Sequence, residues 1–181
     1  RVLLTTVKFL KTNQNKWSQS LNLQASAWRN KEGFRKVLSH FSNQTYFLID
    51  TKTKRDKDDF NINPFASDED DLLGLDQNFK NSLFFNRGLQ RFSFVYSFLN
   101  FRKKTIFSFG DQDVTLKTHQ FQFIHKLAKF WLIDLGAGLN SNSSNSLSYS
   151  NRNYDLDNFN LNPKISYLYN QNTRLELFYN Y

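Results

Sequence analysis

The fold is decided by the stretch Trp17–Trp28, WSQSLNLQASAW. Its odd positions are mostly apolar, including Leu21 and Leu23, whereas its even positions hold Ser, Asn and Gln as far as Ser26. A period of two predicts a β-strand with one apolar and one polar face. Globular strands most often have about five or six residues, whereas a strand that crosses a bilayer takes roughly nine to eleven. A Trp near each end is typical of the aromatic girdles of a membrane β-barrel.

The composition favours the same class. Hydrophobic residues make up 39% of the 181 residues, yet aromatic residues reach 17%, with 20 Phe and 8 Tyr. Disordered chains are poor in aromatic residues, so we expect a folded chain. The absence of Cys excludes disulfides, thiolate metal sites and cysteine nucleophiles. No apolar run approaches the length of a transmembrane helix.

The net charge of +8 raises the question of a nucleic-acid partner. The basic residues, however, gather at the ends of predicted strands, beside turns, where a barrel places its rims. These residues are Lys11, Lys16, Arg29, Lys31, Arg102, Lys103, Lys104, Lys126 and Lys129. The stretch Arg91–Phe98, RFSFVYSF, weakly matches an RNA-binding pattern, but Phe92 occupies its required Gly position. We therefore predict no nucleic-acid partner.

Alternation continues along the chain and predicts about ten strands joined in an up-and-down order. They are Val2–Lys11, Trp17–Trp28, Val37–Asp50, Phe79–Asn86, Gln90–Phe98, Thr105–Phe109, Val114–Lys126, Phe130–Leu139, Phe159–Tyr169 and Arg174–Tyr181. Short polar turns are expected at residues 12–16, 100–104, 110–113, 126–129 and 170–173. An acidic loop insertion is expected at 51–78, on the side of the short turns, and a polar loop at 140–157.

Two stretches carry a resemblance to a known group. DLLGLDQNFKNSLFFNRG (Asp71–Gly88) and LNPKISYLYNQNTRLELFYNY (Leu161–Tyr181) resemble the barrel region of large outer-membrane β-barrel proteins of Bacteroidota. The resemblance implies the outer membrane of a Gram-negative bacterium and a longer parent chain. It also implies as partners the lipid bilayer with its lipopolysaccharide, and other outer-membrane proteins or missing parts of the same chain.

No motif nominates an enzyme or a cofactor. The sequence has no G-x-S-x-G, H-E-x-x-H, P-loop or G-x-G-x-x-G pattern. His119 and His125 share a strand face six residues apart, too far to bind one metal, and His40 stands alone. The acidic cluster at Asp68–Asp71 lacks the spacing of a calcium loop. The pairs Asp111/Asp113 and Asp155/Asp157 are expected in solvated loops, so we predict no metal site.

The prediction is therefore one segment, residues 1–181, of a transmembrane up-and-down antiparallel β-barrel, closed by itself, by missing sequence or by a partner. The lipid-facing band is expected to hold Trp17, Leu21, Leu23, Phe92, Phe94, Tyr96, Trp131, Ile133, Leu135, Ile165, Tyr167, Leu175 and Leu177. The lumen-facing residues are expected to include Asn22, Gln24, Ser93, Asp134, Asn160, Asn162 and Lys164. The expected function is a transport or receptor channel, or a scaffold in an outer-membrane complex. The alternative is a soluble all-β binding module, such as a carbohydrate-binding or adhesive sandwich.

Overall fold

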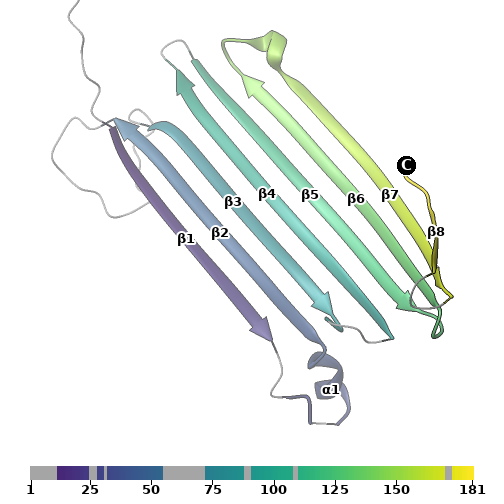
Figure 1. The fold of residues 1–181 in the computed structure, drawn as a ribbon. Coiled ribbons are helices and arrows are strands. Elements are labelled where there is room, and N and C mark those ends of the chain that lie inside the picture. Colours follow the sequence, from purple (N-terminus) through teal and green to yellow (C-terminus); the bar gives the residue numbers. More distant parts are fainter. Residues whose placement is uncertain are drawn as a thin grey trace, which may run out of the picture.

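The chain forms one antiparallel β-sheet in which each strand pairs with the next along the chain (Figure 1). The computed structural model describes residues 12–24, 28–30, 32–54, 72–87, 91–107, 110–169 and 173–181. The eight strands are β1 (Thr12–Gln24), β2 (Phe41–Lys54), β3 (Leu72–Phe85), β4 (Phe92–Phe107), β5 (Gly110–Lys126), β6 (Trp131–Ser146), β7 (Tyr154–Leu168) and β8 (Arg174–Phe178). The all-β, up-and-down antiparallel architecture expected from the sequence is confirmed.

Short helices lie in the connections. Helix α1 (Phe34–Leu38) precedes β2, and the 3₁₀ helix η3 (Ser150–Arg152) lies between β6 and β7. Within the described residues, no helix is long and apolar enough to span a bilayer. We call the end of the sheet with the connections 108–109 and 147–153 the upper end, as it lies in Figure 1, and the opposite end the lower end.

The strands are longer than those of ordinary globular domains. Seven of them have between 13 and 17 residues, or about 43–56 Å at roughly 3.3 Å per residue. The last strand, β8, has 5 residues, but backbone pairing continues beyond it. Tyr181 both donates to and accepts from Leu161, at 3.0 and 3.1 Å between N and O.

Several predicted turns are in fact strand. Residues 100–104 lie inside β4, where they pair with β3 on one side and with β5 on the other. Residues 12–16 likewise belong to β1, and 110–113 to the start of β5. The polar composition that predicted these turns is compatible with a strand because each residue has cross-strand hydrogen-bonding partners.

The two long loops are also shorter than predicted. The polar loop shrinks to residues 147–153, because β6 runs to Ser146 and β7 begins at Tyr154. The acidic loop loses both ends to β2 and β3, and its remainder, 55–71, lies outside the described residues. Trp28 lies beyond the end of β1, and Val37 belongs to α1 rather than to β2.

The count of about ten strands follows from these differences. Gln90–Phe98 and Thr105–Phe109, predicted as two strands, are both part of the single strand β4, and the predicted strand Val2–Lys11 lies outside the described residues. The remaining predicted strands correspond to β1, β2, β3, β5, β6, β7 and β8.

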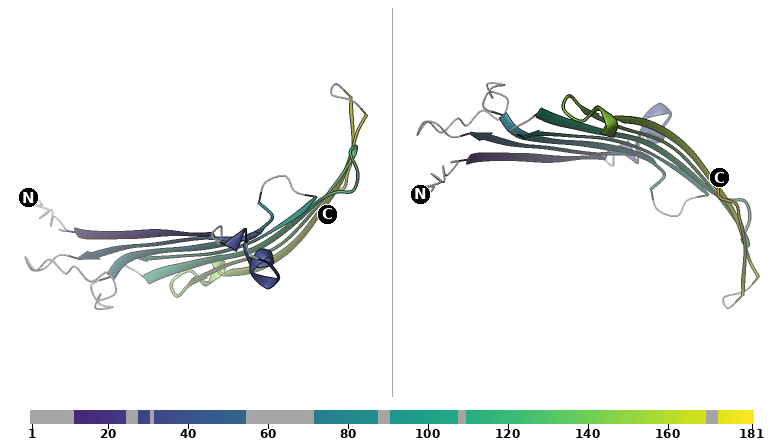
Figure 2. Two further views of the ribbon diagram at one scale, coloured as in Figure 1. Left: turned by 90° about the horizontal axis from the view of Figure 1, so that it is seen from below. Right: turned by 90° about the horizontal axis from the view of Figure 1, so that it is seen from above.

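The sheet is a single bent layer and is not closed (Figure 2). Among the described residues, β1 and β8 each pair with one neighbour only. A hydrophobic core is nearly absent, since Ile49, 2% exposed, is the one buried hydrophobic residue of the described part of the chain. The apolar side chains therefore lie on a face of the sheet rather than between two layers.

Candidate functional site: the two faces of the sheet

The strand register assigns every residue to one of two faces. Directly paired residues of antiparallel strands point to the same side, so the row Leu21–Thr45–Asn81–Phe98–His119–Leu139–Phe159 lies on one face. The same reasoning places every residue of the predicted lipid-facing band on this face, which we call the apolar face. Every residue of the predicted lumen-facing set lies on the opposite one, the polar face.

The apolar face carries a continuous apolar surface. Leu23, Leu139 and Leu177 are 55%, 56% and 74% exposed. Ring contacts join neighbouring strands across it, with centroid distances of 4.7 Å from Phe41 to Phe85, 5.1 Å from Phe85 to Phe94 and 6.3 Å from Phe94 to Phe121. Soluble monomers rarely expose more than a few hundred Å² of contiguous apolar surface. We therefore expect this face to be shielded from water in the functional protein.

A polar cluster interrupts the apolar face on β2 and β3. Asn43 and Asn81 exchange two side-chain hydrogen bonds of 3.2 Å. Thr45 donates to Asn43 at 2.9 Å, and Asn81 donates to Thr45 at 2.8 Å. The cluster was not predicted, although both Asn residues break the apolar alternation of their strands. Because the three side chains satisfy one another, they can lie on an apolar surface at little cost.

We expect Asn81→Leu to destabilise the protein more than the double variant Asn43→Leu/Asn81→Leu. The single change removes the acceptor of the Asn43 side-chain amide, which costs about 1–3 kcal/mol. The double variant removes both amides and leaves only the Thr45 hydroxyl to be satisfied, so we expect a smaller cost. Urea titration followed by Trp fluorescence measures both free energies of unfolding. A double variant that is less stable than the single one would contradict the mutual satisfaction of the cluster.

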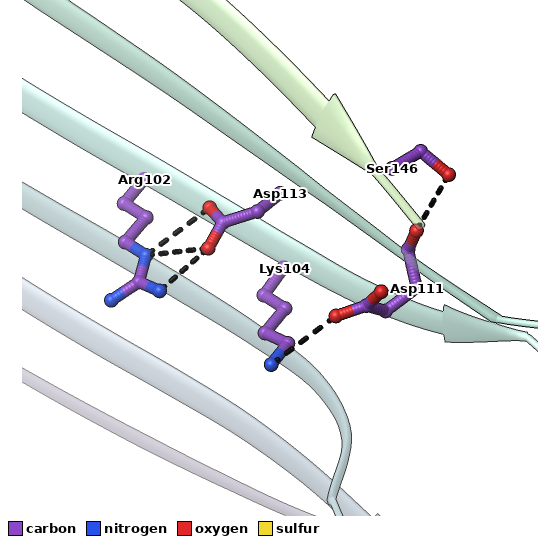
Figure 3. Close-up of polar contacts among 5 residues, drawn as sticks. All are labelled: Arg102, Lys104, Asp111, Asp113 and Ser146. Atoms are coloured by element: carbon purple, nitrogen blue, oxygen red, sulfur yellow. Dashed lines mark hydrogen bonds and ion pairs between the residues drawn. The ribbon is translucent and has the colours of Figure 1, made fainter. Parts of the chain in front are cut away.

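Above the row that runs from Leu21 to Phe159, the apolar face becomes charged on β4, β5 and β7. We call this charged region the charged belt; it consists of Arg102, Lys104, Asp111, Asp113, Lys117, Asp155 and Asp157. On β1 and β2 the face stays apolar above this row, where Trp17 pairs with Ile49. Arg102 donates from Nε to both carboxylate oxygens of Asp113, at 3.0 and 3.1 Å, and the Lys104 Nζ lies 3.4 Å from Asp111 (Figure 3). The hydrogen bond to Asp113 raises the pKa of Arg102 above its usual value.

These positions correct three predictions. Asp111 and Asp113 lie in β5, and Asp155 and Asp157 in β7, so neither pair belongs to a loop. The basic residues Arg102, Lys103 and Lys104 lie within β4 rather than at its end. Ser146 links β6 to this region of β5, because its hydroxyl donates a hydrogen bond to the backbone oxygen of Asp111 at 2.8 Å (Figure 3).

At the level of the charged belt, the polar face changes in the opposite sense and carries apolar side chains. Leu48, Phe101, Leu116 and Leu156 lie on it in one row, next to the charged belt of the other face. Below this row the polar face carries residues such as Gln122 and Asp134, which are joined by hydrogen bonds of 3.1 and 3.2 Å. Strands β4, β5 and β7 thus exchange their apolar and polar sides partway along their length.

Two large hollows lie on the polar face, and a smaller one of about 120 Å³ lies near its upper end, beside Phe107 and Gln112. One, of about 470 Å³, extends from β4 to β8, the bent part of the sheet in Figure 2, and its lining includes Gln120, Asp134, Asn160, Asn162 and Lys164. The other, of about 580 Å³, lies over β1–β4 and is lined mainly by Ser, Asn, Gln and Lys.

Glycines form the floor of the first hollow. A Cβ placed on Gly138 would lie 2.1 Å from the Asn160 Oδ1, and one on Gly136 would lie 3.6 Å from the Asn162 Cβ. Because glycine has no side chain, the Asn residues of β7 can lie over β6 here. Glycines within strands also commonly permit a sheet to bend. Among the predicted lumen-facing residues, Asp134, Asn160, Asn162 and Lys164 meet here, whereas Asn22 lines the second hollow.

The remaining predicted residues are placed as follows. His119 and His125 do share a face, the apolar one, and His119 Nδ1 lies 2.8 Å from the Tyr96 hydroxyl. His40 lies just before β2, and the cluster Asp68–Asp71 lies outside the described residues. Searches for similar proteins found no family model, no curated protein and no solved structure that matches this chain.

Proposed function

We propose that this sheet forms part of the wall of a membrane-spanning β-barrel in the outer membrane of a Gram-negative bacterium. The apolar face meets lipid, and the polar face lines an aqueous lumen. Such a wall serves a transport or receptor channel, or a scaffold in an outer-membrane complex. Closure of the barrel requires that the unpaired edges of β1 and β8, as they stand within the described residues, pair with each other or with further strands.

The observation that carries this proposal is the change of polarity on the apolar face. On β4, β6 and β7 the continuous run of apolar residues on this face ends in one row, at Phe98, Leu139 and Phe159, and polar or charged residues come next. On β1 and β2 the boundary lies higher, because Trp17 and Ile49 still belong to the apolar surface. A bilayer boundary produces such a line, because the same outward face meets hydrocarbon below it and water above it. A sandwich strand, in contrast, keeps one face toward the second sheet.

The connections favour one orientation. The turns 127–130 and 169–173 are short and lie at the lower end, directly beside Trp131 and Tyr167 of the band. Outer-membrane barrels have short periplasmic turns and longer external loops, so the lower end faces the periplasm. Because 100–104 is not a turn, the 55–71 connection falls at the opposite, external end. The long connection 25–40 at the lower end and the two-residue connection 108–109 at the upper end depart from this alternation of loop lengths.

The absence of Cys from the chain allows a clean labelling test. Leu135→Cys places a thiol on the apolar face, Gln122→Cys on the polar face, and Thr115→Cys beside the charged belt. In intact outer membranes, we expect a membrane-impermeant maleimide to label Thr115→Cys and Gln122→Cys, but to label Leu135→Cys only after denaturation. Lipid excludes the reagent from the thiol of Leu135→Cys.

Cell fractionation tests the alternative function, a soluble binding module, with which the open sheet and its polar hollows are also compatible. A protein recovered in the soluble fraction, with no change of gel mobility on boiling, would favour the sandwich. Equal labelling of Leu135→Cys and Gln122→Cys in membranes would refute the assignment of the two faces. The unsubstituted chain is the control for non-specific labelling.

A further inference from the structure

A hollow of about 410 Å³ lies on the apolar face at its border with the charged belt. It extends over β5, β6 and β7, and its lining includes Lys117, His119, Leu139, Ser141, Asp157 and Phe159. We propose that this hollow binds the headgroup of a phosphorylated glycolipid of the outer leaflet. The inference rests on the proposed function, because it requires that this face meet the membrane.

The lining residues form two rows of opposite character. Lys117, Ser141 and Asp157 are cross-strand neighbours in the upper row, and His119, Leu139 and Phe159 in the row below. All six side chains point to the same side, because each row consists of directly paired residues. A ligand that fits has a polar head at the upper row and hydrocarbon below it, which is the form of a membrane lipid.

The charges select a phosphate at one end of the hollow. The neighbouring cations Arg102 and Lys104 are held by Asp113 and Asp111, whereas Lys117 has no ion pair within the described part of the chain. Its ammonium is therefore available for an anion, and a Lys near a membrane surface attracts anionic headgroups. Hydrogen bonds between an ammonium and phosphate are among the stronger ones in proteins.

Asp157 selects a sugar beside that phosphate. Its carboxylate lies two strands away from Lys117, about 10 Å at the usual strand spacing. A carboxylate repels a second phosphate but accepts hydrogen bonds from hydroxyl groups, which a sugar offers and a simple phosphodiester headgroup does not. The exposed side chains of Leu139 and Phe159 favour an acylated molecule over a free sugar phosphate.

The test compares lipids on purified protein in neutral phosphatidylcholine nanodiscs, with bound lipid counted by native mass spectrometry. The probes are an acylated glucosamine disaccharide with one phosphate, its dephosphorylated form, and phosphatidylglycerol. For Lys117→Gln we expect about fivefold weaker retention of the phosphorylated glycolipid and unchanged retention of the dephosphorylated form. Asp157→Asn should weaken retention of both glycolipids. Lys80→Gln, on the polar face, is the matched control and should change nothing.

Equal retention by Lys117→Gln and the unsubstituted protein overturns the proposal, and so does retention of phosphatidylglycerol with the same dependence on Lys117. The cysteine labelling separates this failure from failure of the proposed function. If Leu135→Cys is shielded in membranes and Lys117→Gln has no effect, only the lipid site is wrong. If Leu135→Cys is freely labelled, the membrane wall itself is wrong.

Discussion

Leu135→Arg is expected to prevent assembly of the protein in the membrane. Leu135 lies at the centre of the apolar residues of β6, paired with Phe123 and Pro163, and is 40% exposed on the apolar face. An Arg facing lipid at the bilayer midplane costs roughly 2–4 kcal/mol. We expect the folded, heat-modifiable form to disappear from gels of the membrane fraction.

Two control variants make this result specific to lipid. Gln122→Arg lies on the polar face next to the Asp134 carboxylate, which its side chain already contacts, and should assemble normally. Leu139→Arg lies at the upper border of the band and should cost only about 0–1 kcal/mol, because the penalty falls toward the interface. In a sandwich core the cost would follow side-chain burial instead, so equal losses at positions 135 and 139 would argue against a bilayer.

Gly110→Ala is expected to have the second large effect. Gly110 begins β5 with a φ of 145°, a backbone conformation that residues with a side chain rarely adopt. A Cβ there would also lie 1.8 Å from the Ser148 Oγ and 2.7 Å from the Ser148 Cβ. Strained backbone of this kind costs on the order of 1–3 kcal/mol, so we expect a clear fall in the urea midpoint.

Gly74→Ala is the matched control for this variant. Its added Cβ would meet the Lys104 backbone oxygen at 3.6 Å, an ordinary contact, in a normal strand conformation. Strand interiors lose stability with Gly rather than gain it, so we expect a midpoint equal to or above that of the unsubstituted protein. Equal midpoints for the two variants would show that the conformation of Gly110 is not required.

The assignment of the two faces was predictable because it depends on local alternation alone. Once Leu21 and Leu23 share a face, a period of two and direct cross-strand pairing carry the same side through to Leu175 and Leu177. The sequence of the strands was also predictable, since most turns lie where alternation stops. One error in a turn does not change the face of a residue within its own strand.

The strand ends were not predictable, because they depend on partners distant in sequence. Residues 100–104 resemble a turn in isolation, yet Arg102 and Lys104 meet Asp113 and Asp111 across a strand pair. The polar residues 140–146 remain in β6 because both neighbouring strands hydrogen-bond to it. Asn43 and Asn81 each break the apolar alternation of their own strand, but they are 38 positions apart in the sequence, so local patterns could not pair them.

The length of β4 determines how far a barrel wall of this kind would rise above the bilayer. The strand continues to Phe107, nine residues past Phe98, where the continuous run of apolar residues on its apolar face ends. At roughly 3.3 Å per residue and a tilt of 35–45°, this extension stands about 20–25 Å above the hydrocarbon. The outer mouth would then open well clear of the lipid surface. A macromolecule approaching from outside could bind to this extension of the barrel wall without making any contact with the membrane.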